Sequence, residues 1–268
     1  MKSNKIMATK RANKVNAKRP SLFWLFTEGG RAMAEWGLSI PFRKLTNYEN
    51  SGDGHPVLVI PGFMASDTST KTLRCFLEEA GYAAHGWDLG RNLGKAEFLT
   101  ALGNQLDELY ALYGQKVSII GWSLGGVFAR QIAKRDPEKV RQVITLGSPF
   151  KGISQPNNVA WIYNILKGTK RVADITEELR QDLPNPAPVP TTAIYTKQDG
   201  IVPWQLCLED EETAIHQNIE VRGSHLGLGH NPAVLRIIFD RLQYSAADWV
   251  HFQPSNPVES LVLYPSMT

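Results

Sequence analysis

The stretch from Lys116 to Arg130 restricts the fold of this 268-residue chain most. A short apolar run at 117–120 leads into Gly121-Trp-Ser-Leu-Gly125, and residues typical of a helix follow. This order predicts a strand that turns sharply into a helix, with Ser123 at the apex. Glycines flank the serine because only residues without a Cβ let the chain close so tightly. The first N–H groups of the helix would then lie beside the serine, where they stabilise a developing negative charge.

The pattern alone is weak evidence. G-x-S-x-G occurs by chance in about one chain in ten of this length, and a glycine-rich turn with a surface serine has the same letters. The strand before it and the helix after it favour a functional turn. The rest of the chain has to decide between the two interpretations.

The composition fits one globular α/β domain, because 43% of the residues are apolar and 21% are charged. The net charge of +3 is uneven, since residues 1–20 carry seven Lys and Arg and no acid. The remainder is mildly acidic, which argues against a nucleic-acid-binding body. Cys75 and Cys207 form no CxxC pattern and no disulfide framework. We therefore expect a cytoplasmic chain with no cofactor and no bound metal.

The N-terminal region divides into two parts. Residues 1–20 are basic and polar and are expected to form a disordered tail. Residues 21–45 predict an amphipathic helix. Its apolar side carries Phe26, Met33, Trp36 and Ile40, and its other side carries Glu28, Arg31 and Glu35. The apolar run at 22–26 is too short for a signal peptide or a membrane span. Two interpretations stay open: the helix packs on the domain, or residues 1–40 contact an anionic membrane surface at its periphery.

Strand-like and helix-like segments alternate over residues 46–245, which predicts a parallel sheet covered by helices on both faces. The strands are expected at 57–60, 82–87, 117–120, 140–146, 191–196 and 219–222. Residues 153–190 break the alternation with an apolar patch around Trp161, which indicates either a small lid or a helix pair packed on the core. Residues 246–268 follow as a C-terminal tail with no interpretable pattern.

A serine hydroxyl needs a base to take its proton, and the base needs a carboxylate to orient it. In a parallel sheet such groups lie on loops at the carboxyl ends of strands, because these loops share one edge. Three loops of this kind hold Ser123, Asp199 and His225. The sequence therefore predicts a catalytic set with Ser123 as nucleophile, His225 as base and Asp199 as the orienting acid.

Each partner of the serine has rivals. Asp199 precedes a glycine and has the alternative role of a turn residue. Asp182 and the acids at 209–212 do not directly follow a strand. His230 competes with His225, but it stands next to Asn231-Pro232, a signal for the start of a helix. The chosen pair is favoured by position and not by elimination.

Two further groups complete the predicted site. The oxyanion donors are expected to be backbone N–H groups, those of Leu124 and Phe63, with Met64 as the alternative to Phe63. The apolar side chains of Trp122, Met64 and Trp161 are expected to contact the substrate. Their character favours an acyl chain over a charged substrate.

Five segments carry a combined signature: Pro61-Gly62-Phe63, Gly121-Trp-Ser-Leu-Gly125, Gly147-Ser-Pro-Phe150, Asp199-Gly-Ile-Val-Pro203 and His225-Leu-Gly-Leu228. Together they resemble the α/β-hydrolase superfamily, and most of all its bacterial lipase-like and esterase-like members. The resemblance covers about residues 52–242. It departs from many lipases at Pro61, where they have a histidine.

The resemblance implies an α/β-hydrolase fold, with a mostly parallel sheet flanked by helices and a small lid-like insertion. No two antiparallel strands are recognisable before His55, so the sheet is expected to be shortened at its N-terminal side. The implied activity is hydrolysis of a carboxylic ester or lipid through an acyl-enzyme intermediate. An acyltransferase that uses the same acyl-enzyme and a non-catalytic binding protein on the same fold remain alternatives. The oligomeric state stays open.

Overall fold

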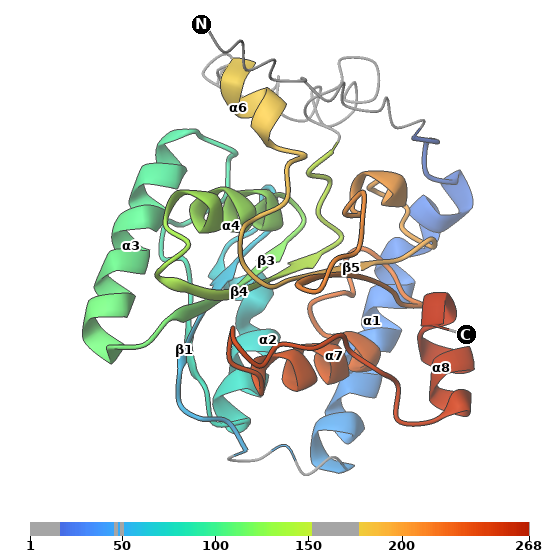
Figure 1. The fold of residues 1–268 in the computed structure, drawn as a ribbon. Helices are drawn as coiled ribbons and strands as arrows, with labels where there is room; N and C mark the ends of the chain where they lie inside the picture. The colour runs from blue at the N-terminus through green and yellow to red at the C-terminus, as the bar shows by residue number, and fades with distance from the viewer. Residues whose placement is uncertain (1–16, 46–47, 49–50, 152–176, 268) are drawn as a thin grey trace, which may run out of the picture.

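The computed structural model describes residues 17–45, 48, 51–151 and 177–267 (Figure 1). Most of the expected basic tail lies outside the described residues. The same holds for most of the expected lid at 153–190, including Trp161.

A single sheet of six strands forms the centre of the domain, in the order β2-β1-β3-β4-β5-β6. The strands are β1 (Pro56–Ile60), β2 (Ala83–His85), β3 (Val117–Trp122), β4 (Val140–Leu146), β5 (Thr191–Tyr195) and β6 (His216–Glu220). Every neighbouring pair is parallel. The predicted α/β fold is therefore confirmed. The described residues ahead of β1 contain a helix and no strand, so the sheet is short on that side as expected.

Helices cover both faces of the sheet (Figure 1). The described helices are α1 (Leu22–Leu45), α2 (Asp67–Glu79), α3 (Glu97–Tyr113), α4 (Leu124–Arg135), α6 (Glu177–Asp182), α7 (Pro232–Leu242) and α8 (Pro257–Leu263). The described residues also form two short 3-10 turns, η2 (Trp204–Leu206) and η3 (Pro265–Met267). None of the described helices has the length and apolarity needed to cross a bilayer.

The core has two layers, one on each face of the sheet. Side chains of a strand point alternately to opposite faces, so β1 sends Val57 and Val59 into the layer under α2 and α7, and Leu58 and Ile60 into the layer under α3 and α4. All five residues of β1 are buried. This double burial explains why the strand is an unbroken apolar run.

The register of the strands aligns the carboxyl ends of β3 to β6. Trp122 pairs with Leu146, and Leu146 pairs with Ile194. Tyr195, the last residue of β5, pairs with Glu220, the last residue of β6. The loops that follow these strands therefore leave the sheet along one edge.

The C-terminal segment is not a free tail. Phe252 and Tyr264 are fully buried in the layer under α7, and the Tyr264 hydroxyl donates to the carbonyl of Ala233 at 3.3 Å. The chain between them forms α8. Burial of two aromatic side chains of this size anchors the segment to the domain.

Candidate active site

Ser123 lies at the turn between β3 and α4 with a φ of 53° and a ψ of −120°. A positive φ is uncommon outside glycine and marks strain that tends to be stored at functional sites. A Cβ on Gly121 would lie 2.3 Å from the Cα of Gly126, and one on Gly125 would lie 2.3 Å from the carbonyl oxygen of Ile60. The flanking glycines are therefore required by backbone contact.

Asp199 and His225 meet beyond the carboxyl ends of β5 and β6. The Nδ1 of His225 lies 2.6 Å from Oδ2 of Asp199, and both side chains are buried. The other oxygen of Asp199, Oδ1, accepts hydrogen bonds from the N–H groups of Ile201 at 2.7 Å and Val202 at 2.6 Å. These bonds fix the carboxylate in the place from which it orients the imidazole.

Electrostatics favour the charged imidazole. Burial by itself lowers the pKa of His225, but the charge and hydrogen bond of Asp199 and the charge of Glu28 outweigh it. The pKa of His225 is therefore raised above its ordinary value of 6.5. An imidazole with these neighbours is stabilised in the form it takes after accepting a proton.

Backbone contacts bring Ser123 to the same edge as His225. The N–H of Ser123 donates to the carbonyl of Leu146 at 2.7 Å. The next residue, Gly147, lies against the imidazole, because a Cβ there would be 3.0 Å from Nδ1 of His225. The structure thus brings all three predicted residues to one place on the sheet.

Trp122 supports the loop of His225. Its Nε1 donates to the carbonyl of His225 at 3.1 Å, and its ring is buried and packs edge-to-face against His230. This is a structural role for Trp122, and its contact with a substrate remains a prediction from the sequence.

The rival acids and base lie elsewhere. His230 donates from Nε2 to the carbonyl of Ala32 in α1 at 2.9 Å, and burial lowers its pKa. Asp182 pairs with Lys134 at 2.9 Å. Glu209 forms a buried ion pair with Arg130 of α4. None of them reaches Ser123 or His225 through a described contact.

The segments that carry the predicted oxyanion donors lie next to Ser123. A Cβ on Gly62 would lie 3.2 Å from the Cβ of Ser123, so the loop after β1 lies directly against the serine. Among the described residues, the N–H of Phe63 has no hydrogen-bond acceptor. Leu124 is the first residue of α4, and its N–H has no acceptor within the helix. Both N–H groups are thus available to a ligand beside Ser123.

The N–H of Met64, the alternative oxyanion donor, already has an acceptor. It donates to the carbonyl of Asn92 at 2.7 Å. The side chain of Asn92 in turn donates to the carbonyl of Pro61 at 2.8 Å. Asn92 thus holds the oxyanion loop at both ends, a role that the sequence analysis missed. Its place on the loop after β2, at the same edge of the sheet, was the available signal.

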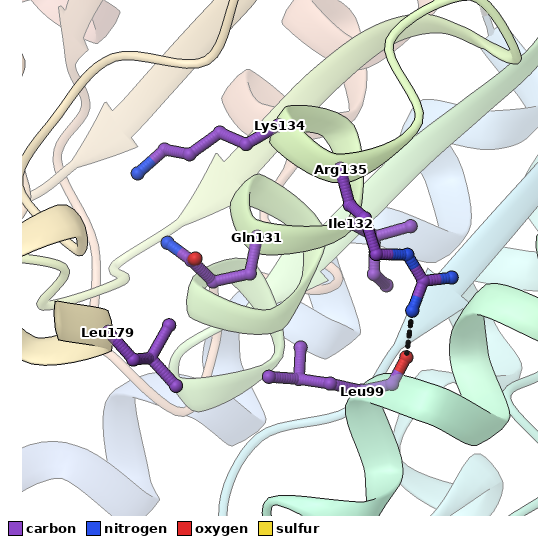
Figure 2. A pocket seen from close by; sticks show the side chains of 6 residues that line it. All are labelled: Leu99, Gln131, Ile132, Lys134, Arg135 and Leu179. Atoms are coloured by element: carbon purple, nitrogen blue, oxygen red, sulfur yellow. Dashed lines mark hydrogen bonds between the residues drawn. The ribbon is translucent and has the colours of Figure 1, made fainter. Parts of the chain in front are cut away.

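A cavity of about 340 Å³ lies at the C-terminal half of α4, beside α3 and α6 (Figure 2). It is lined by Leu99, Gln131, Ile132, Lys134, Arg135 and Leu179. Its cationic side chains already have partners, Asp182 for Lys134 and Asp136 for Arg135. None of the predicted site residues lines it, so this cavity is separate from the candidate active site.

A family model described as palmitoyl protein thioesterase matches residues 56–197, more than half of the chain. The match begins at the first residue of β1, includes Ser123 and ends just before Asp199.

Curated proteins match over shorter stretches. A palmitoyl-protein thioesterase-dolichyl pyrophosphate phosphatase fusion of Schizosaccharomyces pombe is 43% identical over 67 residues, which are 22% of this chain and 11% of that protein. A pimeloyl-[acyl-carrier protein] methyl ester esterase of Aliivibrio fischeri is 29% identical over 106 residues, 38% of this chain and 39% of that protein. The chain therefore spans less than half the length of either relative.

Solved structures match over most of the chain. Aspergillus fumigatus lipase B superposes with a TM-score of 0.55 at 18% identity, over 75% of this chain and 56% of that one. A structure from the study of the metagenome-derived lipolytic enzymes LipS and LipT gives a TM-score of 0.54 at 15% identity, over 72% and 93% of the two chains. At these identities the likeness concerns the fold.

Proposed function

Because the chain belongs to the palmitoyl protein thioesterase family of α/β-hydrolases, we propose that it is a serine hydrolase that cleaves a carboxylic ester or thioester through an acyl-enzyme. The observation that carries the proposal is the buried pair of Asp199 and His225 at the sheet edge where Ser123 sits in strained backbone. Strain, burial and a carboxylate-oriented imidazole at one place are typical of a catalytic site.

The reaction follows from these positions. Ser123 Oγ attacks the carbonyl carbon of the substrate while Nε2 of His225 takes its proton. The negative charge that develops on the carbonyl oxygen is stabilised by the N–H groups of Leu124 and Phe63. Collapse of this intermediate breaks the bond to the leaving alcohol or thiol, which receives the proton from His225. Water then attacks the carbonyl carbon of the acyl-enzyme while His225 takes a proton from it. The bond between this carbon and Ser123 Oγ breaks, Oγ receives the proton from His225, and the carboxylic acid is released.

Apolar side chains beside the triad support an acyl group as substrate. Met64 follows the proposed donor Phe63 and is 48% exposed, and Leu226 follows His225 and is 45% exposed. Apolar surface at the mouth of a site favours an apolar ligand part. Contact between Trp161 and the acyl chain remains a prediction from the sequence.

A fluorophosphonate probe and p-nitrophenyl esters of graded chain length test the proposal. We expect labelling of the folded wild-type chain and none of Ser123→Ala. His225→Ala should lower kcat by about 10³-fold or more, whereas His230→Ala should keep most of the activity, because His230 bonds to Ala32. A folded chain without labelling at Ser123 would favour the non-catalytic alternative. Product analysis with an added alcohol acceptor separates a hydrolase from an acyltransferase.

A cytoplasmic location with peripheral membrane contact is the second part of the proposal. The apolar face of α1 points to solvent: Phe26 is 83% exposed and Met33 is 75% exposed. Other exposed apolar residues of this helix are Leu22, Phe23, Leu25, Trp36, Leu38 and Ile40. An apolar helix face that no described residue covers suits the boundary of a lipid headgroup layer.

The charge of residues 1–45 indicates that the exposed apolar face of α1 contacts an anionic lipid surface. Residues 1–45 contain ten Lys and Arg and two acids, Glu28 and Glu35. Both acids are buried against the domain, at 3% and 9% exposure. The outward face of α1 therefore presents apolar groups without a negative charge, next to a basic segment. This combination matches amphipathic anchors that bind anionic lipid.

Cosedimentation of the full chain with vesicles tests this contact. We expect binding to phosphatidylcholine vesicles with added phosphatidylglycerol, and weak binding to phosphatidylcholine alone. The double variant Phe26→Glu with Met33→Glu should bind at least tenfold more weakly. Leu112→Glu on α3 is the matched control, because Leu112 is 73% exposed and distant from α1. Equal binding of wild type and double variant, or a dimer held through α1, would contradict the proposal.

A further inference from the structure

The polar face of α1 lies against the two loops that carry the predicted acid and base. Figure 1 shows this helix running along the edge of the domain beside α7. The helix lies outside the stretch matched by the family model, and it precedes the sheet. Three of its polar side chains, Glu28, Arg31 and Glu35, form hydrogen bonds with these loops.

Glu28 bonds to both loops with one buried carboxylate. Its Oε1 accepts hydrogen bonds from the N–H of Gly200 at 2.8 Å and from the N–H of His225 at 3.2 Å. Its Oε2 accepts from the N–H of Leu226 at 3.0 Å. Gly200 directly follows Asp199, so this carboxylate joins the neighbour of the acid to the base itself.

Arg31 bonds to the same two loops, at residues that precede Asp199 and His225 in the chain. Its guanidinium donates to the carbonyl of Gln198 at 3.0 Å and to the carbonyl of Gly223 at 2.9 Å. It also pairs with Glu28 at 3.0 Å, which compensates the buried charge. Asp199 and His225 are thus each held before and after by side chains of α1.

Glu35, unlike Glu28, bonds to the loop of His225 alone among the two loops. It accepts from the N–H of Ser224 at 2.7 Å and from the amide of Asn231 at 3.2 Å, and it has no described bond to the loop of Asp199. Burial raises the pKa of Glu35. Glu35 therefore anchors α1 to the loop of His225 without joining acid to base.

We propose that Glu28 is a positioning residue that holds Asp199 and His225 in register for proton transfer at Ser123. The inference rests on the proposed serine hydrolase function. The 2.6 Å contact between His225 and Asp199 requires two separate loops to keep a fixed spacing. A single carboxylate bonded to both loops fixes that spacing before substrate arrives, which is the condition for efficient catalysis.

Glu28 also affects the proton affinity of the base. His225 is faced by Asp199 from the loop after β5 and by Glu28 from α1, and the charge of Glu28 is paired with Arg31. Both carboxylates raise the pKa of His225 against its burial. Loss of the Glu28 charge therefore lowers this pKa, and the acid limb of the pH profile moves to lower pH.

Glu28→Gln tests the role, because glutamine keeps the shape and one acceptor oxygen but loses the charge and the second acceptor. We expect kcat on a p-nitrophenyl ester to fall at least tenfold, KM to stay within about twofold, and the acid limb of kcat/KM to shift downward. Glu35→Gln is the matched control from the same face of the same helix. It should lower Tm without moving the acid limb.

Arg31→Lys provides a second, milder variant, since Arg31 is partly exposed and lysine keeps the charge. It loses the two-sided hydrogen bonding of the guanidinium, so we expect a smaller drop in kcat with an unchanged acid limb. A Glu28→Gln protein with wild-type kcat and an unmoved pH profile, whatever its Tm, would overturn the positioning role. Failure of the probe to label the wild-type chain would instead overturn the serine hydrolase proposal itself.

Discussion

The indole Nε1 of Trp122 donates a hydrogen bond to the backbone carbonyl of His225, with 3.1 Å between the two atoms. The residue just before the proposed nucleophile thus supports the backbone of the proposed base. One contact links the elbow after β3 to the loop after β6, across two intervening strands.

Trp122→Phe is expected to keep the packing of the ring and to leave the carbonyl of His225 without its donor. Loss of a buried partner costs about 1–3 kcal/mol of unfolding free energy, and kcat should fall because His225 is less well fixed. Urea unfolding and ester kinetics measure both effects. Trp249→Phe is the control, because the buried Nε1 of Trp249 has no hydrogen-bond partner among the described residues. Equal kcat in the two variants would show that the contact is not used in catalysis.

Asp199→Asn is expected to fold, since an asparagine oxygen can still accept from the N–H groups of Ile201 and Val202. Its amide would then face Nδ1 of His225 and donate to it. The ring would carry its proton on Nε2, where it can no longer take a proton from Ser123. We expect kcat to fall by about 10⁴-fold. Asp182→Asn should retain wild-type kcat, because Asp182 bonds to Lys134. A fully active Asp199→Asn variant would assign the acid role elsewhere.

The raised pKa of His225 predicts the pH dependence of activity. The base works only when it is neutral, so activity is lost as pH falls through this pKa. The midpoint of the acid limb of kcat/KM should therefore lie above 6.5, the ordinary value for histidine. A pH profile of ester hydrolysis measures it, and a midpoint below 6.5 would contradict the effect of Asp199 and Glu28.

The raised pKa of His225 also predicts that the free energy of unfolding depends on pH. The folded state binds the proton of His225 more tightly than the unfolded state does. This contribution to the free energy of unfolding is fully present below pH 6.5 and is lost as pH rises through the raised folded-state pKa. Wild type should therefore lose stability relative to His225→Gln over that window, as unfolding curves at several pH values can test.

Gly121→Ala is expected to disrupt the turn at Ser123, because the new methyl group would lie 2.3 Å from the Cα of Gly126. Neither backbone segment can yield without moving β3 or α4. We expect a loss of about 3 kcal/mol or more, together with loss of probe labelling. Gly29→Ala in α1 is the contrasting control. No atom lies within 4 Å of a Cβ there, and alanine stabilises a helix by about 1 kcal/mol over glycine. We expect Gly121→Ala to lower Tm and Gly29→Ala to raise it.

The sequence predicted the fold where local signals coincide with burial. β1 and β3 are recognisable because strands buried on both faces are unbroken apolar runs. Ser123, Asp199 and His225 could be predicted to lie at one edge because each stands on the loop that follows a strand. β6 was predicted at 219–222 but spans His216–Glu220. Its first residues are polar, and their buried side chains find partners outside the strand, as His216 does with the carbonyl of Ala187.

The orientation of α1 could not be predicted in the same way. Helical spacing separates an apolar side from a polar side, and burial of the apolar side is the ordinary outcome. Here Glu28 and Glu35 face the domain and Phe26 and Met33 face solvent. The partners that satisfy the two carboxylates are N–H groups of loops far along the chain, and no local pattern reveals them. The two interpretations of this helix, packing on the domain and contact with a membrane, use opposite faces and are compatible.

The bond between Glu28 and the N–H of His225 joins residues 197 positions apart. During synthesis the ribosome makes α1 before the six described strands, and the loop of His225 after them. A contact of such long range closes late, because the chain entropy lost in closing it is recovered only after the intervening sheet has formed. The hydrogen bonds that hold the loop of His225 against α1 are thus completed only when these distant parts of the chain meet. On the proposed function, a chain in which this contact is still open would lack a fixed base for Ser123, and we expect it to be inactive until folding is complete.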